Sequence, residues 1–385
     1  MAEAFPQLGR RLRMGVVGGG PGSFIGPVHR AAALLDARFE LLAGVLSQHA
    51  EKGRAAAAAL GIAPYRTVAE MCRHEPRLDA VAIMTPNHRH FEECRTALAA
   101  GLHVVCDKPI TNTLTEAREL ARLAAAEGRV FCLTHAYTGY PMIRQARAMV
   151  AAGMLGELRA VQVEYLQAGM SQRVEDGPLT DKLRWKLDGA QSGPSLVLGD
   201  IGNHAEHLLR FITGRPITHL AADLGSLVAG RAVHDWCACL LRMQGGVRGT
   251  FVVSQALAGA ENAITVRVHG TRGHLEWVHA NHNKLRFAPH GEPVRTLSRG
   301  GPGMLAPASR LVRLPGGHPE GLLEGFANLY RDAAEAMAAA ILGIVPDPAA
   351  LDFPTAADGV ASLAFTEAAI ASQQGGGAWT EVAAG

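Results

Sequence analysis

The sequence predicts an α/β protein with two domains: a doubly wound parallel sheet, followed by an α+β domain with an open, mostly antiparallel sheet. Short buried apolar runs alternate with helical patterns up to His135, which is typical of a parallel sheet covered on both faces. Longer strands separated by glycine turns follow. The length of 385 residues also exceeds what one core usually organises. We therefore expect domains at 1–135 and 136–385.

The expected elements of the first domain are short and closely spaced. Apolar runs predict strands at Met14–Val17, Phe39–Leu46, Ala80–Met84, His103–Cys106 and Arg129–Leu133. Helical patterns predict helices at Val28–Leu35, Ala50–Leu60, Phe91–Ala100 and Thr115–Glu127. This alternation predicts that ligands bind at the carboxyl ends of the strands.

The second domain is expected to carry longer strands. These are predicted at Leu158–Leu166, Trp236–Met243, Val247–Ser254, Ala263–His269 and His274–Val278. Helices are expected at Pro141–Ala152, Leu322–Ile341 and Thr355–Ser372, and residues 170–194 are expected to form a long polar loop. Helices on one face of such a sheet leave the other face able to pair with a second subunit, so we expect a homodimer or homotetramer.

Composition narrows the class of partner. Lys and Arg number 37 against 35 Asp and Glu, so no excess charge indicates nucleic acid or an anionic membrane. The six cysteines include no C-x-x-C pair, which argues against a zinc site and a disulfide framework. No run of about twenty apolar residues and no signal-peptide core occurs. We expect a cytoplasmic protein with a small, uncharged partner.

A glycine-rich stretch follows the first predicted strand and indicates a dinucleotide site of the Rossmann type. Glycines at 18, 19, 20, 22 and 26 allow a tight turn and close approach of backbone to a ligand. The helix that follows directs free N–H groups and the positive end of its dipole toward a pyrophosphate. With strict G-x-G-x-x-G spacing, Ser23 occupies the position of the third glycine. The expected cofactor contacts of the loop are Gly18, Gly20, Gly22, Ser23, Phe24 and Ile25.

The end of the second strand leaves the choice between NAD and NADP open. An acidic residue usually stands at this strand end and binds the ribose 2′-hydroxyl of NAD. This sequence has Leu46, Ser47, Gln48 and His49 there instead. Ser47, with Lys52 or Arg54 nearby, is compatible with NADP, and an uncharged strand end is also compatible with NAD.

Three polar clusters follow later strands, where a cofactor cleft is expected. They begin at Thr85, Asp107 and Thr134. From the first two clusters we expect cofactor contacts by Thr85, Pro86, Asn87, His90, Asp107 and Lys108. Lys108 precedes a proline that fixes the backbone, so its side chain is a candidate to reach into the cleft.

A second constellation lies at Asp200 and His204. If this stretch is helical, residues four apart share one face, and a carboxylate that accepts from one imidazole nitrogen leaves the other able to take a proton. The alternative is a buried Asp–His pair that caps a helix. His207 is expected to lie behind the site or in the core.

These motifs, in this order, resemble the glucose-fructose oxidoreductase/inositol dehydrogenase/MocA (Gfo/Idh/MocA) family. They are the glycine-rich turn, Thr85-Pro86-Asn87 with His90, Asp107-Lys108-Pro109, Trp185, Ser192-Gly193 and Asp200-Ile201-Gly202-Asn203-His204. The resemblance implies an NAD(P)-binding N-terminal domain and a C-terminal domain that carries the substrate and the oligomer interface. It assigns catalysis to Lys108, Asp200 and His204.

The sequence departs from the family pattern at three places. Asp107 replaces the usual Glu before the lysine, and the glycine loop is longer. Ala136-Tyr137-Thr138 replaces the frequent Asn-Tyr-Arg, which removes the usual substrate contacts. The candidate substrate contacts are therefore His135, Tyr137, Tyr140, Trp185, Lys186 and His204, with an exposed tryptophan able to stack on the apolar face of a sugar.

Three functions follow as hypotheses. The first is reversible oxidation of a secondary alcohol on a sugar, cyclitol or glycoside by a nicotinamide cofactor, with His204 as proton acceptor and Lys108 steadying the oxygen. The second is a redox-neutral glycoside hydrolase that oxidises the ring transiently and keeps its NAD. The third is a non-catalytic nucleotide sensor. No zinc-type spacing occurs among His88, His90 and the Asp200/His204 pair, so no metal is expected.

Overall fold

The computed structural model describes residue 5 and residues 7–384, and it divides into two compact units. Unit 1 comprises the described residues up to Gly139 together with Leu322–Val360, and unit 2 comprises Tyr140–Gly321 and the residues from Ala361 onward. The segment 322–360, which the sequence analysis placed with the second domain, thus packs with the first. The two-domain boundary at residue 135 itself stays a prediction.

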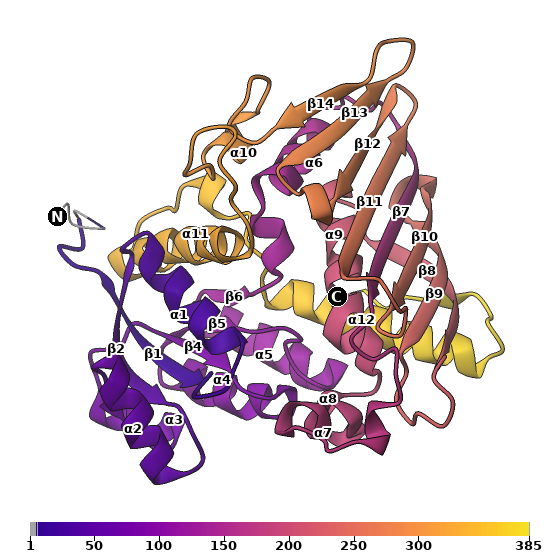
Figure 1. Cartoon of the computed structure of the whole chain (residues 1–385). Helices are drawn as coiled ribbons and strands as arrows, with labels where there is room; N and C mark the ends of the chain where they lie inside the picture. The colour runs from indigo at the N-terminus through magenta and orange to yellow at the C-terminus, as the bar shows by residue number, and fades with distance from the viewer. Residues whose placement is uncertain (1–4, 6, 385) are drawn as a thin grey trace. The chain divides into compact units, whose positions relative to one another are not determined.

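The described residues of unit 1 contain a six-stranded parallel sheet with the order β3-β2-β1-β4-β5-β6 (Figure 1). The strand order reverses between β1 and β4, which is where doubly wound sheets bind ligands. Its strands are β1 (Leu12–Gly18), β2 (Phe39–Val45), β3 (Ala63–Pro64), β4 (Ala80–Met84), β5 (His103–Cys106) and β6 (Phe131–Leu133). The predicted doubly wound sheet is confirmed.

Local sequence signals set the helix ends of unit 1. Thr113 caps α5 through a capping box with Glu116, and Thr67 caps α3 by accepting from the Glu70 N–H. The helices are α1 (Ile25–Leu35), α2 (Ala50–Leu60), α3 (Val68–His74), α4 (His90–Ala99), α5 (Leu114–Ala126) and α11 (Leu322–Leu342). β3 and α3 were not predicted, because a two-residue strand and a seven-residue helix carry too little periodicity.

Helix α11 belongs to the core of unit 1 although it lies near the end of the chain. Its buried residues Phe326, Tyr330 and Met337 share one hydrophobic cluster with Val16 of β1 and Phe39 of β2. The rings of Phe39 and Tyr330 meet edge to face with centroids 5.7 Å apart. This packing groups 322–360 with the parallel sheet.

The described residues of unit 2 contain a nine-stranded sheet with the order β14-β13-β12-β11-β7-β10-β9-β8-β15 (Figure 1). Its pairs are antiparallel except β7 with β10, so the expected mostly antiparallel sheet is confirmed. The strands are β7 (Leu158–Gln167), β8 (Ile217–Gly225), β9 (Trp236–Met243), β10 (Arg248–Ser254), β11 (Asn262–Gly270), β12 (Gly273–Val278), β13 (Lys284–Pro289), β14 (Arg295–Ser298) and β15 (Thr380–Glu381).

One face of this sheet is covered by helices and the other is exposed. Phe365 of α12 packs on Phe251 of β10 with ring centroids 5.0 Å apart, whereas Glu164 and Leu240 point to solvent. The helices are α6 (Pro141–Ala151), α7 (Asp181–Leu187), α8 (Gly189–Ser192), α9 (Asn203–Thr213), α10 (Ala306–Ser309) and α12 (Ala356–Gln374), the last crossing the unit boundary. Single-turn helices are η1 (Asn87–Arg89), η2 (Ala136–Gly139), η3 (Val174–Asp176), η5 (Gln244–Gly246), η6 (His279–Asn281) and η7 (Pro348–Ala350), and η4 (Leu198–Gly202) is a π turn.

The expectation of a continuous loop over 170–194 is wrong. Thr180 and Asp188 cap the short helices α7 and α8. Leu183 and Leu187 of α7 pack against a small cluster of Met170, Leu196 and Val233. Apolar anchoring of this kind depends on distant residues, so it is not visible in the local polarity of the segment.

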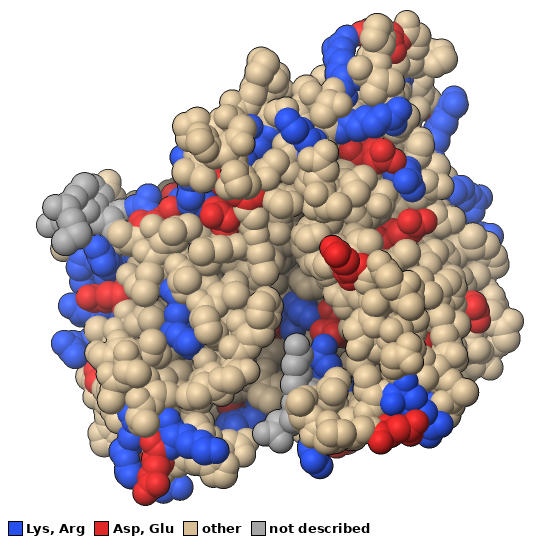
Figure 2. All heavy atoms as spheres, in the orientation of Figure 1, with Lys and Arg blue, Asp and Glu red and all other residues tan. Residues whose placement is uncertain are grey.

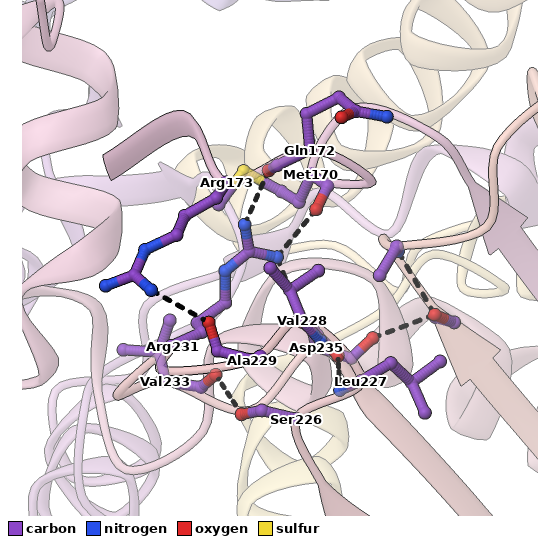
Figure 3. A network of polar contacts seen from close by, with 12 residues as sticks. Met170, Gln172, Arg173, Ser226, Leu227, Val228, Ala229, Arg231, Val233 and Asp235 are labelled. Atoms are coloured by element: carbon purple, nitrogen blue, oxygen red, sulfur yellow. Dashed lines mark hydrogen bonds and ion pairs between the residues drawn. The ribbon is translucent and has the colours of Figure 1, made fainter. Parts of the chain in front are cut away.

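A buried arginine fixes the start of this segment (Figure 3). The Arg231 side chain is fully buried, and it donates to the Met170 carbonyl at 2.6 Å, the Gln172 carbonyl at 2.8 Å and Asp235 Oδ2 at 2.9 Å. Its Nε donates to Glu175 Oε1 at 2.8 Å, and this hydrogen bond holds the pKa of Glu175 below its usual value. Residues 170–175 are thereby tied to the connection between β8 and β9.

The surface carries mixed charge. On the face drawn in Figure 2, basic and acidic side chains alternate and most of the surface carries neither. Among the described residues, no helix has the length and hydropathy needed to cross a bilayer.

Removing core volume from α11 tests its place in unit 1. Met337→Ala deletes a fully buried side chain and is expected to cost about 2–5 kcal/mol, which lowers the thermal unfolding midpoint of unit 1 by at least about 4 °C. Ile341→Ala, four residues on and 38% exposed, is the control and is expected to leave the midpoint nearly unchanged. Equal midpoints for the two variants would contradict the packing described here.

Candidate active site

The glycines between β1 and the start of α1 are required by backbone conformation or by close neighbouring atoms. Gly18, Gly19 and Gly22 have positive φ, which other residues adopt only with strain. A Cβ on Gly20 would lie 2.0 Å from the Leu46 carbonyl oxygen, and one on Gly26 would lie 2.1 Å from the Gly19 carbonyl oxygen. The backbone itself therefore forms the surface of the loop.

The start of α1 suits an anionic group. Its first turn contains no acidic residue, and the Ser23 hydroxyl accepts from the Gly26 N–H at 3.2 Å. Arg30 donates to the Gly19 carbonyl at 2.7 Å and braces the loop from behind. Phe24 is 67% exposed directly before the helix. A glycine-rich loop with exposed backbone at a helix N-terminus fits the pyrophosphate of a dinucleotide.

The end of β2 is uncharged, as the sequence indicated. Ser47 is half-buried and accepts from the His49 N–H at 3.1 Å, and Gln48 and His49 are exposed. This geometry keeps the Ser47 side chain at the strand end, next to the loop through Leu46.

The cluster after β4 is held by its own hydrogen bonds. Thr85 donates to Glu93 Oε2 at 2.5 Å, and Arg89 pairs with the other oxygen of Glu93 at 2.6 Å. Pro86 is half-buried, and Asn87 is buried. His90 is 1% exposed, and each of its ring nitrogens contacts a backbone carbonyl of the protein. The expected contact of His90 with the cofactor stays a prediction.

Asp107 organises the backbone at Lys108. Its Oδ1 accepts from the Lys108 N–H and from the Thr134 hydroxyl, both at 2.9 Å. His29 Nε2 lies 3.8 Å from the same oxygen, and His29 Nδ1 lies 2.7 Å from the Tyr330 hydroxyl. Burial raises the pKa of Asp107, but His29 and Lys108 outweigh it and hold this pKa well below its usual value. The Asp107 carboxylate thus fixes the backbone position of Lys108, a half-buried residue. The Lys108–Pro109 peptide bond is cis.

Three of the expected substrate residues are buried. Two of them lie in unit 1. His135 directly precedes η2 and is 1% exposed, and Tyr137 lies within η2 and is 6% exposed. Tyr140 lies in unit 2, where its ring centroid is 5.2 Å from His282 and 6.0 Å from Trp277. These positions are compatible with support of a site from behind, and direct substrate contact by these residues stays a prediction.

The stretch with Asp200 and His204 contains a π turn. η4 spans Leu198–Gly202, and α9 continues from Asn203. Single π turns inside helices occur often at functional sites, because the extra residue changes the direction of the side chains around it. The Nδ1 atom of His204 is buried. The expected hydrogen bond between Asp200 and His204 stays a prediction.

Asp200 lies in a polar cluster of unit 2 that includes Lys186. Lys186 Nζ is 2.5 Å from Asp200 Oδ2, and Gln255 Nε2 donates to the same oxygen at 2.7 Å. Both members of the ion pair are mostly buried, with side-chain exposures of 15% and 21%. Trp185, next to Lys186, is half-buried. The structure therefore brings Lys186 and Asp200 together.

Four polar residues of this cluster were missed by the sequence analysis: Tyr165, Gln167, Gln255 and Asn262. The Tyr165 ring lies 6.5 Å from the His204 ring, and its hydroxyl donates to Asn262 at 2.7 Å. Gln167 donates to the same amide oxygen at 2.7 Å. Gln167 ends β7 and Gln255 follows β10, and no local sequence signal indicates that these two strands pair in parallel.

Among the described residues, no group of three or more His, Cys, Asp and Glu side chains has the geometry of a metal site.

Comparison with known proteins defines the class. A model of the oxidoreductase family with an NAD-binding Rossmann fold matches residues 12–135, and a model of the GFO/IDH/MocA C-terminal domain matches residues 143–276. Unit 1 therefore contains an NAD-binding Rossmann domain, and the protein is an NAD-binding oxidoreductase.

Full-length similarity supports the same class. An uncharacterized oxidoreductase, YfiI, of Bacillus subtilis strain 168 is 33% identical over 384 residues, with 97% of this chain and 98% of that protein covered. The crystal structure of an oxidoreductase from Sinorhizobium meliloti is 41% identical, with a TM-score of 0.86 and coverages of 96% and 99%. That of an inositol dehydrogenase homolog with NAD+ from Azotobacter vinelandii is 37% identical, with a TM-score of 0.91 and coverages of 96% and 97%. The chain belongs to the Gfo/Idh/MocA family of oxidoreductases.

A methyl group at Gly20 tests the glycine-rich loop. Gly20→Ala places a carbon where the Leu46 carbonyl stands, so the loop has to move, and we expect the Kd for NAD to rise at least about tenfold. Titration of the protein with NADH, followed by fluorescence, measures this.

Gly53→Ala is the matched control. An added Cβ there lies 3.6 Å from its nearest neighbour, in ordinary contact, inside α2. Helix propensity predicts a gain of roughly 0.5–1 kcal/mol in stability and an unchanged Kd for NAD. NAD binding by Gly20→Ala as tight as by Gly53→Ala would contradict the assignment of the loop.

Proposed function

We propose that this protein is an NAD-dependent dehydrogenase that oxidises a secondary alcohol of a neutral sugar, cyclitol or glycoside. The observation that carries the proposal is the polar cluster of unit 2. Its two charges, on Lys186 and Asp200, neutralise each other at 2.5 Å, and the groups around them are amides and a phenol. Such a set binds hydroxyl groups through paired donors and acceptors and offers no surplus cation to a carboxylate or phosphate.

Named relatives support this substrate class. The structure of the inositol dehydrogenase homolog with NADH and myo-inositol is 37% identical to this chain, with a TM-score of 0.88. A levoglucosan dehydrogenase of Pseudarthrobacter phenanthrenivorans is 26% identical over 236 residues, which cover 56% of this chain and 59% of that enzyme. Both names denote neutral polyhydroxylated rings, and we transfer that class, without a particular substrate.

We assign the proton transfer to His204. Its Nδ1 is buried, so Nε2 is the nitrogen proposed to accept the hydroxyl proton, and Asp200 is proposed to stabilise the resulting imidazolium. Lys108 is proposed to steady the substrate oxygen as charge develops on it. Bound NAD supplies the acceptor for the electrons of the alcohol.

The remaining expected contacts stay part of the proposal. Residues proposed to bind the cofactor are Gly18, Gly20, Gly22, Ser23, Phe24, Ile25, Ser47, Thr85, Pro86, Asn87, His90, Asp107 and Lys108. Residues proposed to contact or support the substrate are His135, Tyr137, Tyr140, Trp185, Lys186 and His204. We further propose a homo-oligomer that pairs through the exposed face of the unit 2 sheet, and a cytoplasmic location.

A panel assay tests the function. The purified protein is incubated with inositols, monosaccharides, anhydrosugars and aryl glycosides and either NAD+ or NADP+, while absorbance at the reduced nicotinamide band and release of the aryl group are recorded. We expect reduced cofactor in proportion to oxidised product. Aryl release without accumulation of reduced cofactor would instead indicate a redox-neutral hydrolase, which no observation here favours, and no turnover with any polyol would overturn the proposal.

Replacing the ammonium of Lys108 separates catalysis from binding. Lys108→Met keeps the length of the side chain and removes its charge, so kcat is expected to fall by about 10²–10⁴ while the Kd for NAD changes less than about threefold. Lys284→Met, at an exposed position of β13, is the control and is expected to keep full turnover. Unchanged kcat for Lys108→Met would refute the role of Lys108.

A further inference from the structure

His90 is the first residue of α4 and contacts two carbonyl groups at once. Its Nδ1 lies 2.7 Å from the Pro109 carbonyl oxygen, and its Nε2 lies 2.8 Å from the Thr85 carbonyl oxygen. The side chain is 1% exposed, so water does not compete for these contacts. Thr85 follows β4, and Pro109 follows Lys108 after β5. The ring therefore bridges two strand ends that the cofactor is proposed to meet.

The two contacts determine the protonation state of the ring. A carbonyl oxygen only accepts hydrogen bonds, and a neutral imidazole carries one N–H donor and one lone pair. In either neutral tautomer, one lone pair would face a carbonyl oxygen at less than 3 Å, without water to relieve it. Imidazolium carries two N–H groups and satisfies both carbonyls.

The charges around the ring permit a buried cation. The Asp107 carboxylate precedes Lys108 in the chain, and the Cys106 thiol of β5 is neutral near pH 7, because burial raises its pKa well above the usual value. Burial lowers the pKa of His90, whereas the hydrogen bond to the Pro109 carbonyl and the charge of Asp107 raise it. Two features oppose the charge, the nearby ammonium of Lys108 and the N-terminus of α4. Arg89, the last residue of η1, forms an ion pair with Glu93 of α4, so these two residues contribute little net charge.

We propose that His90 is a permanent imidazolium that positions Lys108. Its two N–H groups tie the end of β4 to the turn that carries the lysine, and Asp107 fixes the same turn through the Lys108 N–H. His90 does not act on the substrate and is a positioning residue. The kinetic consequence rests on the proposed function of Lys108, whereas the protonation state does not.

His103 provides a matched contrast in the same sheet. It is also 1% exposed, but its Nδ1 accepts from the Val130 N–H at 2.9 Å, which requires a lone pair on that nitrogen. Burial, reinforced by the charge of Arg129, lowers the pKa of His103 to about 4. Two equally buried histidines are thus held in opposite protonation states by the backbone groups that face them.

Nuclear magnetic resonance of the full chain with ¹⁵N-labelled histidine tests the protonation states. We expect both ring nitrogens of His90 to carry protons from pH 6 to pH 8.5 and Nδ1 of His103 to be unprotonated throughout, with signals assigned by their loss in His90→Gln and His103→Gln. A His90 ring with one unprotonated nitrogen at pH 7 would overturn the inference, whatever the protein catalyses.

Kinetics test the positioning role. His90→Gln retains one hydrogen-bond donor but loses the positive charge and the second hydrogen bond to a carbonyl. We therefore expect kcat to fall about 10- to 100-fold, with a KM for substrate changed less than about threefold. His103→Gln is the control and is expected to change neither. A purely structural role would lower the fraction of protein that binds NADH while leaving kcat per binding site intact, which would overturn the positioning role. If Lys108→Met also retains full turnover, the proposed function fails instead.

The pH dependence of stability follows from the raised pKa. The charge of His90 contributes its full stabilisation below the pKa of the unfolded chain, about 6.5, and loses it as pH rises through the raised pKa of the folded chain. The difference in unfolding midpoint between the wild type and His90→Gln is therefore expected to shrink steadily between pH 7 and pH 10. A difference that stays constant over this range would contradict a charged ring.

Discussion

The Asp107 carboxylate, whose side chain is 15% exposed, is the interaction on which the carboxyl-end edge of the parallel sheet in unit 1 depends. It joins four parts of the chain: the turn at Lys108, Thr134 after β6, His29 of α1 and, through His29, Tyr330 of α11. The Asp107 carboxylate accepts from the N–H of the next residue, and a short side chain is long enough for this hydrogen bond. Asp can therefore make it where the family usually has Glu. The groups around it keep the carboxylate charged, and a charged acceptor makes stronger hydrogen bonds than a neutral one.

Unit 2 has a corresponding acidic residue in Asp200, in a different setting. The π turn η4 interrupts the helix there, and Lys186 and Gln255 converge on one carboxylate oxygen. Arg231 fixes the segment that leads to Lys186 by binding two carbonyls and two carboxylates. The charges of Lys186 and Asp200 therefore balance within the cluster.

The sequence predicted helices and strands well where the apolar periodicity was strong. It predicted them poorly where an element is stabilised by contacts with residues distant in sequence. β4 and β9 were predicted with their observed ends, because a buried strand is a continuous or alternating apolar run. β13, β14 and the helices of 170–194 were not predicted, because short amphipathic segments become regular only when paired or packed. Gln167 and Gln255 were missed because the parallel pairing of β7 with β10 cannot be read from either strand alone.

The sequence by itself determined the doubly wound sheet and the position of the glycine-rich loop, because each depends on local spacing and residue type. Only the tertiary structure decided how those residues are held. It placed α11 in the core of unit 1, set the His90 ring between two carbonyl groups, and paired Lys186 with Asp200. Such roles follow from distances between residues remote in sequence, which burial and backbone partners fix and which local patterns do not contain.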